Sequence, residues 1–186
     1  MATFKIIDKQ SEQVFQEIER RIYRLQSGGT LDSLKAIGAD TQGQIGASFV
    51  SLKQLASRYT PDETVALLLW NTGKREEQII ACLLLPEETN KEKITQLMKT
   101  CLNMEIAGYV GSLYLSHHPA LLEISDEWLD SGIPSLQVAA LTALARHLII
   151  NKNNCLINKV EFKKILDREY KDNFVRMTAE RYRFNL

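Results

Sequence analysis

The sequence has no excess of charge of either sign and contains little cysteine. Its 186 residues include 23 basic and 23 acidic side chains, so the formal net charge is zero. A neutral protein has no overall field to attract a polyanion, which weighs against strong nucleic-acid binding. Cys82, Cys101 and Cys155 are widely spaced and predict neither a disulfide framework nor a zinc site. Such cysteine usage is typical of a reducing compartment, so we expect a cytoplasmic protein.

Long apolar runs are also missing. The longest, VALLLW and IIACLLL, are far shorter than the roughly 20 residues that a membrane-spanning helix needs. The first ten residues, MATFKIIDKQ, lack the apolar core of a signal peptide. We therefore expect a soluble protein with no membrane partner. The length suits a single domain over residues 1–186, with one hydrophobic core.

Charge is distributed unevenly along the chain. Residues 61–130 hold 5 basic and 12 acidic side chains, whereas residues 131–186 hold 10 basic and 5 acidic ones. We expect any anionic partner to contact the C-terminal third.

Apolar residues recur with helical spacing and almost nowhere with the alternation of a strand. The clearest start signal is Thr60-Pro61-Asp62-Glu63, which predicts a capping box with Thr60 as N-cap. We expect residues 27–46, rich in Gly, Ser, Asp and Thr, to form a loop around one short helix. The predicted helices span residues 11–26, 61–71, 74–85, 91–100, 103–116, 119–130, 135–150, 158–168 and 173–183.

The predicted helices come in pairs, which start near residues 61, 91, 119 and 158. Spacings of 28 to 39 residues are typical of a degenerate array of HEAT-like repeats, in which each pair buries its apolar face against its neighbours. A four-helix bundle is the rival fold, but it would need fewer and longer helices. We predict an all-α protein whose HEAT-like (ARM/HEAT-like) repeats form a right-handed α-superhelix.

The segment CLNMEIAGYVGSLYLSHHPA, residues 101–120, is expected to be helical although it contains Gly108 and Gly111. A glycine inside a helix costs about 1 kcal/mol relative to alanine. Two explanations are open: close packing against a neighbouring backbone, or a site that needs open space.

Residues 47–150 resemble a known family, the AlkD-type DNA alkylation repair glycosylases, which are compact HEAT-like repeat proteins. The resemblance rests on FVSLKQLASRYTPDETVALLLWNTGKREEQIIACLLL and on LLEISDEWLDSGIPSLQVAALTALARHLI. The first 46 and last 36 residues match the family poorly. The resemblance implies excision of alkylated purines from DNA.

This sequence departs from the family at the residues that carry the chemistry. The resemblance implies a tryptophan at Met104, an acidic residue at Glu105, a catalytic aspartate at Gly108 and a phosphate-binding arginine at Val138. Only the acidic residue is present, so we interpret the four positions as vestigial and expect no catalytic residue. Glu105 could still supply a carboxylate, because it lies near the same helical face as Gly108.

A non-catalytic binding module is therefore the predicted function, and a glycosylase with a rearranged site is the alternative. The partner is either double-stranded DNA, held through phosphates, or another protein. The resemblance favours DNA, whereas the zero net charge favours a protein.

Lys164, Arg168 and Lys171 recur at intervals of four and three residues, which predicts one basic stripe on a helix. Together with Arg146 they are the candidate phosphate contacts. The alternative is a solvated face without a ligand.

Other residues suggest structural roles. Trp70 and Trp128 are expected to anchor helix packing, and Cys82 to lie in the core. His117 and His118 have no acid or cysteine at metal-ligand spacing, and His147 is expected at the rim of an apolar helix. We expect no metal and no cofactor.

Overall fold

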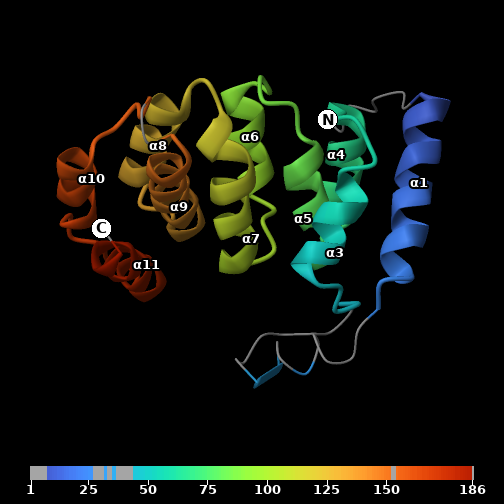
Figure 1. Cartoon of the computed structure of the whole chain (residues 1–186), viewed down its shortest axis with the longest axis horizontal. Coiled ribbons are helices and arrows are strands. Elements are labelled where there is room, and N and C mark those ends of the chain that lie inside the picture. Colours follow the sequence, from blue (N-terminus) through green and yellow to red (C-terminus); the bar gives the residue numbers. More distant parts are fainter. Residues whose placement is uncertain (1–7, 27–31, 33–34, 37–43, 152–153, 186) are drawn as a thin grey trace. The chain divides into compact units, whose positions relative to one another are not determined.

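The computed structural model describes residues 8–26, 32, 35–36, 44–151 and 154–185 (Figure 1). All regular structure in these residues is helical, which confirms the predicted all-α class. The helices are α1 (Lys9–Tyr23), α3 (Phe49–Ala56), α4 (Glu63–Asn71), α5 (Arg75–Leu84), α6 (Lys91–Met98), α7 (Met104–Tyr109), α8 (Leu121–Asp130), α9 (Pro134–Ile150), α10 (Lys159–Leu166) and α11 (Asn173–Phe184). None of the helices described combines the length and the apolarity that crossing a bilayer requires.

The chain divides into two compact units, residues 1–86 and 87–186. A single domain over residues 1–186 stays a prediction, as do the HEAT-like repeats and the right-handed superhelix. The loop and short helix predicted for residues 27–46 lie largely outside the described residues.

In the first unit, α4 packs against α5, and α1 contacts α3, α4 and α5 (Figure 1). Trp70 at the end of α4 is 1% exposed, and Cys82 in α5 is also buried. Both residues therefore fill the core as predicted. The first turn of α5 is buried although it is polar, and Glu76 Oε1 there accepts the backbone N–H of Gly46 at 2.9 Å.

The start of α4 differs from the sequence prediction. The helix begins at Glu63, and its N-cap is Asp62, whose carboxylate accepts the backbone N–H of Val65 at 2.9 Å. The predicted capping box at Thr60 is wrong by two residues. Asp62 is the N-cap because its carboxylate caps a helix as well as a hydroxyl does, and its negative charge also interacts favourably with the positive end of the helix dipole.

The sequence reasoning missed α3, although its start has a clear signal. The Ser48 hydroxyl accepts the backbone N–H of Ser51 at 3.2 Å, and Leu52 and Leu55 face the core from the following turns.

In the second unit, the 17-residue helix α9 is central. It contacts α6, α7, α8, α10, α11 and the irregular turns between α7 and α8. Small residues permit this, because Ala139, Ala140 and Ala143 are all fully buried along its length. Helix α9 therefore carries the surface against which the other helices of this unit are placed.

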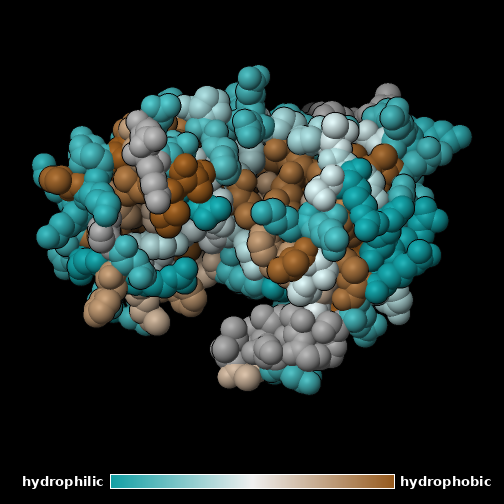
Figure 2. Space-filling model, viewed as in Figure 1, coloured by the Kyte–Doolittle hydropathy of each residue, from teal (hydrophilic) through white to brown (hydrophobic). Residues whose placement is uncertain are grey.

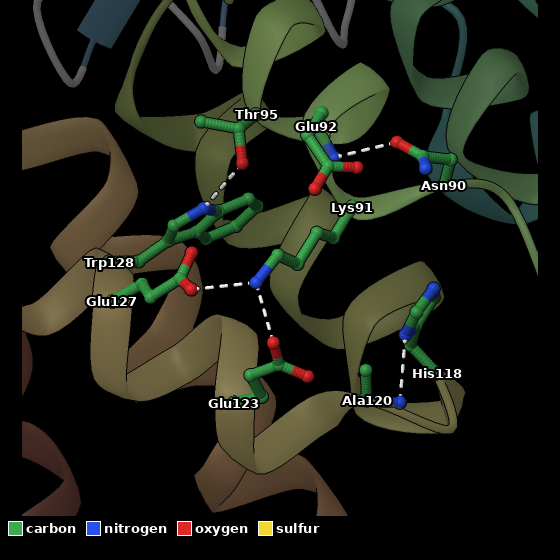
Figure 3. A network of polar contacts seen from close by, with 9 residues as sticks. All are labelled: Asn90, Lys91, Glu92, Thr95, His118, Ala120, Glu123, Glu127 and Trp128. Carbon is green, nitrogen blue, oxygen red and sulfur yellow. Dashed lines mark hydrogen bonds and ion pairs between the residues drawn. The ribbon is translucent and has the colours of Figure 1, made fainter.

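Polar contacts join α6 to α8 at the edge of this unit (Figure 3). Lys91 donates to Glu123 at 2.5 Å and to Glu127 at 2.7 Å, and these bonds raise the pKa of the Lys91 ammonium. Beside them, the Trp128 indole N–H donates to Thr95 Oγ1 at 2.9 Å. Trp128 is 1% exposed and anchors helix packing as predicted.

Candidate nucleic-acid interface

The helix predicted over residues 103–116 begins as expected but changes its geometry after two turns. Asn103 caps α7 by accepting the backbone N–H of Ile106 at 3.0 Å. After Tyr109 the chain continues as a π-helix over Val110–Tyr114 and then as a 3₁₀ turn over Leu115–His117. A π-helical turn changes the direction in which successive side chains point and is frequent at functional sites.

The residues singled out on α7 line one cavity of about 520 Å³ in the second unit. Met104, Glu105 and Gly108 contribute from α7. Val138 and Arg146 contribute from α9, so five of the eight predicted site residues share this cavity. Val138 is 4% exposed and offers no charge, whereas Arg146 is exposed.

The two glycines of this segment have different reasons to be glycine. A Cβ on Gly111 would collide with the backbone oxygen of Ala139 and lie only 2.9 Å from the Cβ of Thr142. Glycine is required there because α9 approaches the backbone. A Cβ on Gly108 would meet nothing within 4 Å, because this position faces the open cavity. Close packing explains Gly111 and open space surrounds Gly108.

Helix α11 completes the cavity with residues that the sequence reasoning did not select. Arg181, Phe174 and Tyr182 line it. The Tyr182 hydroxyl bonds Thr142 Oγ1 at 3.2 Å, and the Arg181 guanidinium carbon lies 5.4 Å from the Tyr182 ring centroid. The alternation of basic and aromatic residues in RYRF was the available signal, but the family resemblance did not extend to it.

The cavity thus combines two guanidinium groups, aromatic side chains and one carboxylate. Among the described residues, no carboxylate pairs with Arg146 or Arg181. Guanidinium groups without a carboxylate partner can donate hydrogen bonds to phosphate oxygens. The arrangement is suited to binding an anion with an attached ring or sugar.

The other predicted phosphate contacts do not line this cavity. Lys164 borders a separate, shallow depression with Glu161 and Asp126, and Arg168 is paired with Asp130 at 3.0 Å. The predicted basic stripe is wrong, because α10 ends at Leu166 and Lys171 lies in the turn before α11. The three cations therefore do not share one helical face.

Two of the three histidines are structural. His118 Nδ1 accepts the backbone N–H of Ala120 at 3.0 Å, so its Nε2–H donates to the Thr89 carbonyl at 3.0 Å (Figure 3 shows the Ala120 contact). His147 is buried rather than at the rim as predicted, and it lies between the Ser116 carbonyl and the backbone N–H of Leu156. Its ring satisfies backbone groups that would otherwise be buried without partners.

In the part of the chain that the structure describes, no three His, Cys, Asp or Glu side chains gather where they could hold a metal ion. Burial raises the pKa of the Cys101 thiol to about 11, so this cysteine is a poor nucleophile.

Comparison with known proteins adds one finding. The family model described as DNA alkylation repair enzyme matches residues 10–168. A search of curated proteins and a search of solved structures each gave no match. Because the matched segment covers most of the chain, including α7 and α9, this protein belongs to the DNA alkylation repair enzyme family.

Proposed function

We propose that this family member is AlkD-type, with HEAT-like helix pairs, and that it binds duplex DNA through phosphate contacts without removing bases. The observation that carries the proposal is the cavity between α7, α9 and α11, which Arg146 and Arg181 line together with Gly108. Gly108 is the position at which the resemblance implies a carboxylate.

The absence of catalysis follows from Gly108. Excision of an alkylated base develops positive charge on the sugar, and a carboxylate held at the reacting carbon stabilises that charge. Glycine at position 108 offers only open space. Met104 provides no aromatic surface for the sugar, and Val138 provides no cation, so the three groups are missing from the positions at which the resemblance implies them.

Binding is supported by the two arginines. A phosphodiester entering the cavity could accept hydrogen bonds from both guanidinium groups, and these contacts carry no base specificity. Lys164, Arg168 and Lys171 stay predicted as outer phosphate contacts. Arg168 should be the weaker contact, because it already pairs with Asp130.

Titration of a fluorescent DNA duplex at two salt concentrations tests this proposal. The logarithm of the binding constant should fall by about 0.9 per log unit of salt for each phosphate neutralised. Replacing Arg146 and Arg181 together by glutamine should weaken binding and reduce that slope by about 1.8. Arg176→Gln is the control, because Arg176 lies on α11 but not in the cavity. Absence of binding even at low salt would end the DNA hypothesis and leave a protein partner.

A glycosylase with a rearranged site is the second candidate, because Glu105 lines the same cavity. Incubation with DNA that contains 3-methyladenine or 7-methylguanine should release no base above background. Release that collapses in Glu105→Gln would establish this alternative. Gly108→Asp alone should remain inactive, since catalytic groups that work as a unit are not restored singly.

A further inference from the structure

A second cationic depression lies in the first unit, between α1 and α3. Its volume is about 220 Å³, several times the 30 Å³ or so that one water occupies. Three arginines, Arg21, Arg24 and Arg58, border it together with Ser51 and Gln54. Helices α1 and α3 contact one another, and hydrophilic side chains dominate the visible face of α1 (Figures 1 and 2).

The arginines differ in what already binds them. Arg21 donates from Nε and Nη2 to Glu17 Oε1, at 2.8 and 2.7 Å. The Tyr59 hydroxyl donates to the same carboxylate oxygen at 3.3 Å. Within the described residues, no hydrogen bond or ion pair engages the side chain of Arg24 or of Arg58. Both guanidinium groups are therefore without a polar partner among the described residues.

The charge around the depression stays positive after the opposing groups are considered. Glu17 offsets one of the three arginines. Helices α1 and α3 both end nearby, and each C-terminus carries about half a negative charge. About one positive charge is left among the described residues. The positive charge of the three arginines is therefore greater than the two helix C-termini and Glu17 compensate.

We propose that this depression is a phosphate-binding site, independent of the cavity between α7, α9 and α11. Arg24 directly follows α1 and Arg58 lies two residues beyond α3, so one phosphate could accept from both guanidinium groups. The Gln54 amide offers a further donor, whereas the Ser51 hydroxyl already shares a hydrogen bond with Ser48. The phosphate comes either from the backbone of a nucleic acid or from a small phosphate ion.

Nuclear magnetic resonance of the full chain tests the site, with inorganic phosphate as the probe and chloride at equal ionic strength as the reference. The backbone amide signals of residues 21–25 and 51–58 should shift saturably with phosphate. In a variant with Arg24→Gln and Arg58→Gln the affinity should fall about tenfold or more, since each hydrogen bond between charged groups contributes that much.

The control variant carries Arg20→Gln in α1 and Lys53→Gln in α3. These changes remove the same total charge outside the depression and should leave affinity within twofold. Shifts that do not saturate, that chloride reproduces, or that persist in the Arg24/Arg58 variant would overturn the proposal. A short DNA duplex identifies the source: shifts at the same amides assign a nucleic-acid backbone, and shifts with free phosphate alone assign a small ion. Arg146 and Arg181 are unchanged throughout, so this result is independent of the proposed DNA binding.

Discussion

Substituting alanine at each of the two glycines near α7 should change stability in opposite directions. Gly108 and Gly111 are three residues apart, and a glycine-to-alanine change adds the same single methyl group at both. Helix propensity favours alanine at both positions by about 1 kcal/mol. Any difference between the two variants therefore reports on the space around each Cβ.

At Gly108 the new methyl group meets nothing within 4 Å, so only the propensity effect remains and the free energy of unfolding should rise by about 0.5 to 1 kcal/mol. At Gly111 it meets the backbone oxygen of Ala139, and the Cβ of Thr142 is 2.9 Å away. A backbone carbonyl within α9 cannot rotate away as a side chain can, so overpacking should lower the free energy of unfolding by about 1 to 3 kcal/mol.

Thermal unfolding followed by circular dichroism measures both changes. For a protein of this size, 1 kcal/mol corresponds to about 2 to 4 °C in Tm. Gly108→Ala should unfold a few degrees above the wild type and Gly111→Ala several degrees below it. A Gly111→Ala protein as stable as the wild type would refute the close approach of α9. A destabilised Gly108→Ala protein would refute the open space at the cavity.

Three further changes are expected to alter stability. Asp62→Ala should lower the free energy of unfolding in urea by about 1 kcal/mol, because it removes the cap of α4, whereas Thr60→Ala should leave that free energy nearly unchanged. A larger loss in Thr60→Ala than in Asp62→Ala would instead support Thr60 as the N-cap. Leu144→Ala should cost about 2 to 5 kcal/mol in the same assay, because Leu144 is 1% exposed, and a cost below 1 kcal/mol would contradict its place in the core. Burial raises the pKa of the Glu77 carboxyl above its ordinary 4.5 despite the nearby Lys74. The folded state therefore holds the carboxyl proton more tightly than the unfolded state, and stability is lost as pH rises from 4.5 through the raised pKa. Glu77→Gln should flatten that loss in unfolding titrations from pH 4 to 8, and an unchanged slope would contradict the assignment to Glu77.

Helix positions could be predicted because the helical spacing of apolar residues and the turn residues are both visible in the local sequence. Residues 135–150 were predicted as helical and α9 spans Pro134–Ile150, where proline at the first position marks the start. The π-helix at Val110–Tyr114 could not be predicted from local spacing. It contains Gly111, where α9 approaches the backbone closely, and the sequence alone does not show that tertiary contact.

The candidate site was predictable on α7 and α9 but not on α11. Family motifs identified Gly108 and Val138 as neighbours in function, and both line the cavity. In α11 Val175 and Ala179, four residues apart, are buried, and Arg181 and Tyr182 line the cavity. Their spacing indicates a buried face of the helix, but it does not show that this face meets α9.

The zero net charge argued against DNA binding, but net charge is a sum over the chain, whereas a phosphate responds to the charge close to it. Several cations of this protein are compensated locally: Lys91 lies between two glutamates, and Arg168 and Arg183 each pair with an aspartate. At physiological salt, charges more than about 8 Å away are largely screened, so distant acids do not weaken an arginine that has no acidic partner. Arg146 and Arg181 are such arginines within the described residues. A neutral chain can therefore bind a phosphate backbone weakly and with a dependence on salt, because several of its acids are engaged in ion pairs elsewhere.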